Sequence, residues 1–185
     1  SGFFAETYAS KLTNAIIKHQ VLKNVFDAST ATEFPDNMWA DQLKMVSQLM
    51  QSAPARGAKR DIFFVRQGGY DTHKNVAPRL VEHFSIMSAA LEAFVEELKT
   101  LELWESTVIL QFSEFGRTLS PNTGDGTDHG WGGNHFMLGG SVKGGKVLGQ
   151  YPSDFEQGNL VLSRGRMIPT TPWDAMWKGA AEWFG

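Results

Sequence analysis

The sequence contains no cysteine in its 185 residues. This absence excludes disulfide bonds, thiolate zinc sites and cysteine nucleophiles, so any metal has to be held by oxygen and imidazole ligands. It does not decide the compartment, because exported and cytosolic proteins can both lack cysteine.

Long apolar runs and clusters of basic residues are missing as well. No stretch approaches the roughly 20 apolar residues that span a bilayer, and the first ten residues, SGFFAETYAS, do not have the pattern of an intact signal peptide. The formal charge of -3 and the lack of a Lys/Arg run argue against a nucleic-acid surface. We therefore expect neither a membrane span nor a nucleic-acid partner.

What the chain does contain is enough apolar material for a core, with 42% hydrophobic and 12% aromatic residues. We expect a single α/β domain over residues 1–185. Residues 1–58 would form a helical lead-in, and residues 59–185 would form the core that carries the motifs. Helical spacing of apolar residues predicts helices over 4–28, 38–50 and 75–101, and helix-start residues predict a further helix over 172–184. Asp36 or Asn37 is the expected N-cap of the second of these helices, and Thr171 that of the last, with Pro172 at its first position.

Two short apolar segments, 61–66 and 107–112, have the character of buried strands on either side of the third predicted helix. Strand, helix and strand in this order predict a right-handed βαβ unit with parallel strands. Residues 114–149 hold eleven of the 19 glycines, which predicts a long, tightly turned loop with short strands near 135–138 and 146–149.

Two Asp-His pairs follow these strands. Asp71 and His73 stand after the first strand, and Asp128 and His129 stand in the glycine-rich loop. Because ligands bind at the carboxyl ends of parallel strands, we expect both pairs at one sheet edge. Carboxylate and imidazole groups are ligands for Zn²⁺, Mn²⁺ and Fe²⁺ and leave positions open for a substrate. The alternative is that these side chains only cap turns and satisfy backbone groups of the loop.

Glu114 and Arg117 leave the second strand three residues apart. Glu114 is a candidate metal ligand or general base, and Arg117 can hold a phosphate or sulfate oxygen through two N–H groups. The alternative is a structural Glu114–Arg117 ion pair that braces the loop.

The segments FFVRQGGYDTH, LEAFVEELKTL, STVILQFSEFGRT, GTDHGWGGNHFMLGGSVKGGKVLG and IPTT resemble the C-terminal half of the family called domain of unknown function 1501. That family looks like a branch of the alkaline phosphatase and sulfatase superfamily. The resemblance implies a layered α/β sandwich, with a mostly parallel sheet flanked by long helices and a divalent metal (Zn, Mn or Ca) at the strand ends. It assigns Asp71, His73, Asp128 and His129 as ligands and places Glu114 where a further ligand pair begins, with Phe115 standing where that pair has its histidine. The superfamily takes its nucleophile from an N-terminal half to which no segment of this chain corresponds.

We therefore expect a metal-dependent hydrolase-like domain for phosphate or sulfate esters, with Glu114 and Arg117 as catalytic residues and an anionic small molecule or glycan as substrate. Without a nucleophile in the chain, catalysis by this chain alone is an open question at this point. The alternative is a non-catalytic module of an exported protein that binds metal or recognises a glycan or protein. The resemblance suggests a periplasmic or extracellular location, and an exposed sheet edge would favour a homodimer.

Overall fold

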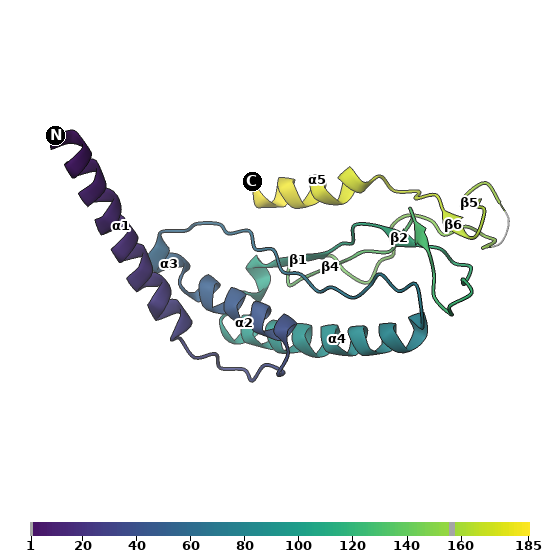
Figure 1. Ribbon diagram of the computed structural model, residues 1–185, viewed down its shortest axis with the longest axis horizontal. Helices are drawn as coiled ribbons and strands as arrows, with labels where there is room; N and C mark the ends of the chain where they lie inside the picture. The colour runs from purple at the N-terminus through teal and green to yellow at the C-terminus, as the bar shows by residue number, and fades with distance from the viewer. Residues whose placement is uncertain (1, 156–157) are drawn as a thin grey trace. The chain divides into compact units, whose positions relative to one another are not determined.

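The computed structural model describes residues 2–155 and 158–185, and at residues 3, 18, 21 and 24 it describes the backbone alone. Figure 1 shows the order of the elements along the chain. Their contacts divide the chain into two compact units, the first made of Ser1–Arg66 with Met87–Leu101 and the second of Gln67–Ile86 with Glu102–Gly185. Helix α4 (Val76–Thr100) contributes to both units, so the division differs from the lead-in expected over residues 1–58.

The first unit is built from α1 (Gly2–Phe26), α2 (Met38–Gln51), α3 (Ala53–Arg56) and the second half of α4. The expected cap of α2 is confirmed at Asn37, whose Oδ1 accepts a hydrogen bond from the backbone N–H of Ala40 at 2.9 Å. The apolar face that α2 turns inward is the one its helical spacing predicts. The buried apolar side chains of the unit are those of Val25, Ala40, Leu43, Val46, Ala90, Ala93, Phe94 and Leu98.

A buried carboxylate fixes the loop that follows α1. Glu97 is completely buried, and its oxygens accept hydrogen bonds from the backbone N–H groups of Ala31 at 3.3 Å and Thr32 at 2.8 Å. A buried charge has to be hydrogen-bonded to be tolerated, and these bonds meet that need. Glu97 therefore has a structural role in the loop between α1 and α2.

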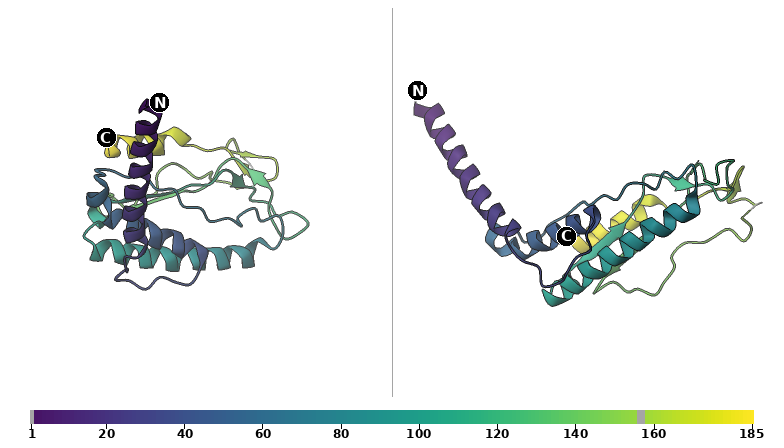
Figure 2. Two further views of the ribbon diagram at one scale, coloured as in Figure 1. Left: turned by 60° about the vertical axis from the view of Figure 1, so that its left-hand side comes forward. Right: turned by 60° about the horizontal axis from the view of Figure 1, so that its bottom comes forward.

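Most of the described apolar side chains of helix α1 are exposed to solvent. Val25 near its end is 3% exposed, whereas Phe4 is 82% and Tyr8 71% exposed. The N-terminal turns of the helix lie clear of α2 and α3 (Figure 2). The predicted helix is thus confirmed, but burial against this unit does not account for its apolar spacing.

The predicted buried strand over 61–66 is wrong. The segment is extended but pairs with no strand among the described residues, and Ile62 and Phe64 are 80% and 72% exposed. At its end the backbone of Arg66 bonds to the side chain of Gln42, whose Oε1 accepts from the Arg66 N–H and whose Nε2 donates to the Arg66 carbonyl, both at 3.0 Å. A side chain of α2 therefore satisfies backbone groups that we assigned to a sheet.

The second unit contains three short antiparallel ladders in the described part of the chain. Strand β1 (Val108–Gln111) pairs with β4 (Phe136–Gly139), which confirms strands within 107–112 and near 135–138. Strand β2 (Gly116–Arg117) pairs with β3 (His129–Gly130), and β5 (Val161–Leu162) pairs with β6 (Arg166–Met167). The predicted strand at 146–149 is wrong, because those residues are exposed and form no ladder.

The predicted parallel βαβ unit is not formed among the described residues, since 61–66 is not a strand and the one partner of β1, β4, is antiparallel. Short antiparallel ladders neither establish nor exclude a layered alkaline-phosphatase-like sandwich, which stays a prediction. We expected the ends of two parallel strands to bring the site residues together. In the second unit the antiparallel β2–β3 ladder and a backbone hydrogen bond from Thr127 to Thr72 do so.

Helix α5 (Trp173–Phe184) attaches to β1 through aromatic rings. Phe112 meets Trp173 and Trp177 edge-on, with ring centroids 6.0 and 5.0 Å apart. The N-cap is Pro172 and has no side-chain hydrogen bond to the first turn, so Thr171 does not cap the helix as we expected. The short 3-10 helix η1 (Trp104–Ser106) lies between α4 and β1 in the chain, and α5 follows β6.

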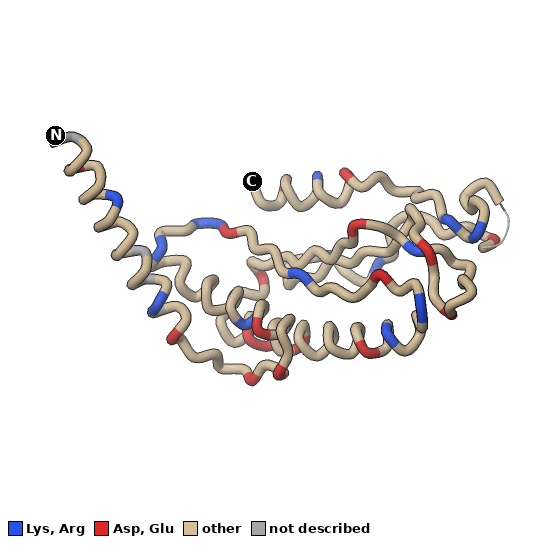
Figure 3. Tube along the Cα trace, viewed as in Figure 1, with Lys and Arg blue, Asp and Glu red and all other residues tan. Residues whose placement is uncertain are grey.

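No helix in the described residues is long and apolar enough to cross a membrane. Lys and Arg positions are interspersed with Asp and Glu positions along the chain (Figure 3).

Candidate metal centre

The segment before α4 turns sharply, and this turn sets the first pair of site residues. The backbone N–H of Thr72 donates to the carbonyl of Tyr70 at 3.0 Å, and that of His73 donates to the carbonyl of Asp71 at 3.1 Å. Successive bonds across one residue are typical of γ-turns. Thr72 is 1% exposed, while Asp71 and His73 on either side of it stand out from the backbone.

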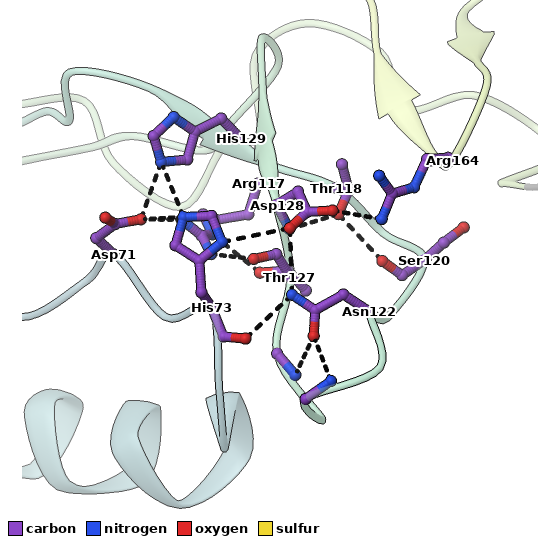
Figure 4. Close-up of polar contacts among 12 residues, drawn as sticks. Asp71, His73, Arg117, Thr118, Ser120, Asn122, Thr127, Asp128, His129 and Arg164 are labelled. Carbon is purple, nitrogen blue, oxygen red and sulfur yellow. Dashed lines mark hydrogen bonds and ion pairs between the residues drawn. The ribbon is translucent and has the colours of Figure 1, made fainter.

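The β2–β3 ladder brings the second group of residues to the same place. Arg117 lies opposite His129 in its register. The backbone N–H of Thr127 donates to the carbonyl of Thr72 at 3.0 Å, which joins the glycine-rich loop to the turn that precedes α4. Residues 46 to 58 positions apart in the chain are thereby brought into contact (Figure 4).

Three electron-pair donor atoms converge at this point. Asp71 Oδ1 lies 3.0 Å from His73 Nε2 and 2.9 Å from His129 Nε2, and the two imidazole nitrogens are 3.3 Å apart. The three side chains form a group that could hold a metal ion, because one ligand atom from each lies within 4.8 Å of the others, and each side chain is about half exposed. Two arrangements would hold these atoms together: N–H groups of the imidazoles that donate to Asp71 Oδ1, beside the guanidinium of Arg117 at 2.6 Å, or a metal ion between the three atoms.

Asp128 lies behind this group. Its Oδ1 is 3.3 Å from Nδ1 of His73, on the other side of the imidazole ring from Asp71. A hydrogen bond from Nδ1–H to a carboxylate fixes the tautomer in which Nε2 carries a lone pair. Asn122 donates to the same carboxylate oxygen at 3.2 Å, and Arg164 pairs with the other oxygen. The structure therefore places Asp128 where it can orient His73, outside the three convergent atoms.

Arg117 is tied into the cluster by three of its N–H groups. Its Nη1 donates to Asp71 Oδ1 at 2.6 Å, its Nε donates to Thr127 Oγ1 at 2.9 Å, and its Nη2 donates to the carbonyl of Thr127. A guanidinium has five such groups, so about two remain for an anionic ligand. The alternative Glu114–Arg117 ion pair does not form, because Arg117 is paired with Asp71 instead.

Both carboxylates are held in their charged form. The hydrogen bond from His129, followed by that from Arg117, lowers the pKa of Asp71 below its ordinary value. The hydrogen bond from Asn122 lowers the pKa of Asp128, with a further contribution from the charge of Arg164. Ionised carboxylates are the form that a metal ion binds.

Three contributors to the site were missed from the sequence. Phe115 stacks on His129 with ring centroids 4.1 Å apart and planes 19° from parallel, and Asn122 and Arg164 contact Asp128. Phe115 carried a signal, since it stands where the resemblance places a histidine. Arg164 carried none, because 36 residues separate it from Asp128.

Residues 6–159 match a family described as protein of unknown function, DUF1501. The chain belongs to the DUF1501 family. No curated protein and no solved structure matches it significantly. This match confirms the family that the sequence resembles. Because the family has no known function, the function of the cluster formed by Asp71, His73 and His129 has to be argued from its chemistry.

The residues of this DUF1501 chain fit a divalent ion. Metal–ligand distances of about 2.0–2.2 Å put neighbouring donor atoms about 3 Å apart around an octahedral ion and about 3.4 Å apart around a tetrahedral one. The observed separations of 2.9, 3.0 and 3.3 Å fall in that range. Two histidines and one carboxylate are also a known donor set for open transition-metal sites. The Asp71 oxygen that meets the two imidazoles, Oδ1, also accepts a hydrogen bond from Nη1 of Arg117 at 2.6 Å, so an ion at this point would share that oxygen with Arg117.

Glu114 is not drawn into the DUF1501 cluster by any contact. Its side chain is exposed and makes no hydrogen bond or ion pair within the described part of the chain. Its role as ligand or base stays a prediction, whereas the other predicted residues, Asp71, His73, Arg117, Asp128 and His129, are brought together.

Proposed function

We propose that this DUF1501 chain binds a divalent metal ion through Asp71, His73 and His129 and acts in the hydrolysis of phosphate or sulfate esters. The observation that carries the proposal is the convergence of one carboxylate oxygen and two imidazole nitrogens within 3.3 Å of one another. A metal ion would supply the positive charge that holds such electron pairs together, in addition to the Arg117 guanidinium that donates to Asp71 Oδ1 at 2.6 Å. A layered fold of the alkaline phosphatase and sulfatase type is part of the same proposal.

The bound ion would supply a Lewis acid that polarises an ester oxygen or a water molecule. The chain's own residues would do the rest. Asp128 holds the His73 ring with Nε2 facing the cluster, and Phe115 limits rotation of the His129 ring by stacking on it. Arg117 presents its remaining N–H groups to the anionic oxygens of the ester, whose charge matches a planar guanidinium.

Glu114 is the proposed proton acceptor. Glu114 follows the end of β1 and stands three residues before Arg117, and its carboxylate makes no hydrogen bond within the described residues. A general base needs an accessible carboxylate near the proton it removes. Exchange of Glu114 for Gln keeps the size of the side chain and removes its basicity, so this variant separates a base from a structural residue.

One observation favours a second candidate, a metal site that only braces the glycine-rich loop. The side chains of Asp71, His73 and His129 are 57%, 48% and 53% exposed. Electrostatic stabilisation of a transition state is strongest where water is excluded, and a cluster this open gives less of it. In that case the same ligands would bind metal as part of a non-catalytic recognition module.

The experiment that separates the two candidates measures release of 4-nitrophenol from its phosphate and sulfate esters by the chain loaded with Zn²⁺, Mn²⁺ or Ca²⁺. Hydrolysis predicts turnover that needs the ion and is lost in Asp71→Asn. The matched control is His19→Ala, which alters an exposed histidine on α1. Metal bound stoichiometrically without turnover of either ester would contradict the hydrolase and leave the bracing role.

A further inference from the structure

An open pocket of about 680 Å³ adjoins the metal cluster in the second unit. His73 and Asp128 belong to its lining as well as to the cluster, so the two spaces share a wall. The other polar side chains of the lining include Lys74, Asn122 and Arg164. The imidazole ring of His73 therefore stands between the cluster, which Nε2 meets, and the pocket residue Asp128, which Nδ1 meets.

The charge of the lining is opposite to that of the chain. Lys74 and Arg164 contribute two positive charges and Asp128 one negative charge, which leaves one net positive charge with His73 neutral. The whole chain carries a formal charge of -3. Arg164 lies in the turn between β5 and β6 and pairs with Asp128 (Figure 4). A positive hollow on a negative chain favours an anionic ligand.

The one carboxylate of the lining is already neutralised. Asp128 Oδ1 accepts from Asn122 and faces His73, and its Oδ2 pairs with Arg164. Lys74, in contrast, makes no hydrogen bond or ion pair through its ammonium group among the described residues. Among the charged side chains of the described lining, Lys74 is thus the one whose charge has no partner.

The backbone at Arg164 argues that its side chain is needed. Its φ is 66°, a left-handed conformation that glycine or asparagine adopts at lower cost. An arginine there costs about 1 kcal/mol or more, and such outliers gather at ligand sites. Its side chain reaches Asp128 from the turn between β5 and β6.

The pocket wall is held in place before any ligand arrives. Asn122 Oδ1 accepts from the backbone N–H groups of Gly124 at 2.9 Å and Gly126 at 3.1 Å. Its Nδ2 donates to the carbonyl of His73 at 3.0 Å. Lys74 forms a backbone bridge with Asp125, which also has a left-handed φ of 53°. A preorganised wall spares a ligand the cost of ordering it.

We infer that this pocket takes a second anionic group of the substrate, a carboxylate, phosphate or sulfate carried beside the ester group that the metal cluster binds. Lys74 is the residue that binds this second anionic group, and Arg164 contributes positive charge while it pairs with Asp128. The inference rests on the proposed function for the position of the first anionic group. It narrows the substrate class to esters with an additional negative charge, such as acidic or multiply substituted sugars.

The test compares two non-hydrolysable probes of nearly equal size, 2-carboxyethylphosphonate and propylphosphonate, by titration calorimetry. The first carries the second anionic group and the second does not. The wild-type chain is expected to bind the carboxyethyl compound about fivefold more tightly, as for a charged hydrogen bond in a partly exposed site. In Lys74→Ala the ratio of the two affinities should fall to about one. In Lys178→Ala, which removes an exposed lysine of α5, the ratio should stay at its wild-type value.

Titration with and without Zn²⁺ separates this inference from the proposed function. Zn²⁺ binding with equal affinity for both probes would overturn the pocket and leave the metal site. No Zn²⁺ binding, with a preference that Lys74→Ala removes, would overturn the proposed function and leave an anion pocket. A preference that Lys74→Ala does not change would also overturn the inference, because the second charge would then be read elsewhere.

Discussion

His73 Nδ1 lies 3.3 Å from Asp128 Oδ1, at a different edge of the imidazole ring from the Nε2 atom that meets Asp71. A carboxylate behind a ligating histidine sets its tautomer and orientation, and loss of such a partner lowers metal affinity by about 10- to 100-fold. We predict the order wild type, Asp128→Asn, Asp128→Ala for decreasing Zn²⁺ affinity, because asparagine keeps an acceptor without its charge. Competition with a chromogenic chelator measures it, and equal affinities would show that Asp128 does not orient His73.

Phe115 should act on the metal site through His129. Its ring stacks on that imidazole at 4.1 Å, so a smaller side chain frees the ring to rotate. We expect Phe115→Ala to weaken Zn²⁺ binding by about threefold to tenfold, on the scale of one aromatic pair. Phe115→Tyr retains the stack and should bind as wild type does. A tyrosine variant as weak as the alanine variant would point to a packing defect instead.

Arg117 should stabilise the fold as well as the site. Its guanidinium joins Asp71 to Thr127 through Nη1, Nε and Nη2. A lysine cannot make this set of bonds, so Arg117→Lys should lower the free energy of unfolding by about 1–2 kcal/mol without metal. Urea denaturation of the metal-free protein gives the value. Unchanged stability would show that the three bonds are replaced by water at no cost.

Gly126 should be intolerant of a side chain. A Cβ there would lie 2.1 Å from the carbonyl carbon of His73, and backbone atoms cannot give way. Gly126→Ala should cost about 1–3 kcal/mol and disturb metal binding, because it separates the loop from the turn that carries His73. Gly133→Ala is the matched control, since its Cβ would meet Gly116 at an ordinary 3.8 Å. Equal losses in both variants would refute the close approach as the cause.

The metal-free protein should lose stability in acid through its site carboxylates. The pKa values of Asp71 and Asp128 are lowered in the folded chain, so both groups stabilise it above their unfolded pKa. That contribution disappears as the pH falls below about 4 and through the folded values. Melting temperatures followed from about pH 6 to pH 3 should fall less steeply for Asp128→Asn than for wild type. Parallel curves would show that Asp128 is not linked to folding.

The helices were the part of the fold that the sequence predicted best. The structure places α2 and α4 within one residue of the expected 38–50 and 75–101, because their apolar spacing is sustained over many turns. Segment 61–66 has the composition of a buried strand, but composition does not say whether a neighbouring strand is present. Gln42 provides the hydrogen bonds to Arg66 that a strand would have provided.

The site residues were predicted from a parallel sheet that the described residues do not form. Parallel strand ends were to bring the two Asp-His pairs together, whereas the β2–β3 ladder and the bond from Thr127 to Thr72 do so. Phe115 was visible only as a departure from the resemblance, which does not predict its stacking on His129, and Arg164 could not be placed, since a contact across 36 residues leaves no local pattern. Residue chemistry was therefore informative where topology was not.

Metal uptake is the most direct measurement of the central claim. The chain is dialysed against metal-free buffer and titrated with Zn²⁺ and Mn²⁺, and bound metal is counted by elemental analysis for wild type, His129→Ala and the control His19→Ala. We predict one tightly bound metal ion per chain in wild type and in His19→Ala, and loss of this ion in His129→Ala. The same metal content in all three proteins, or none in wild type, would contradict it.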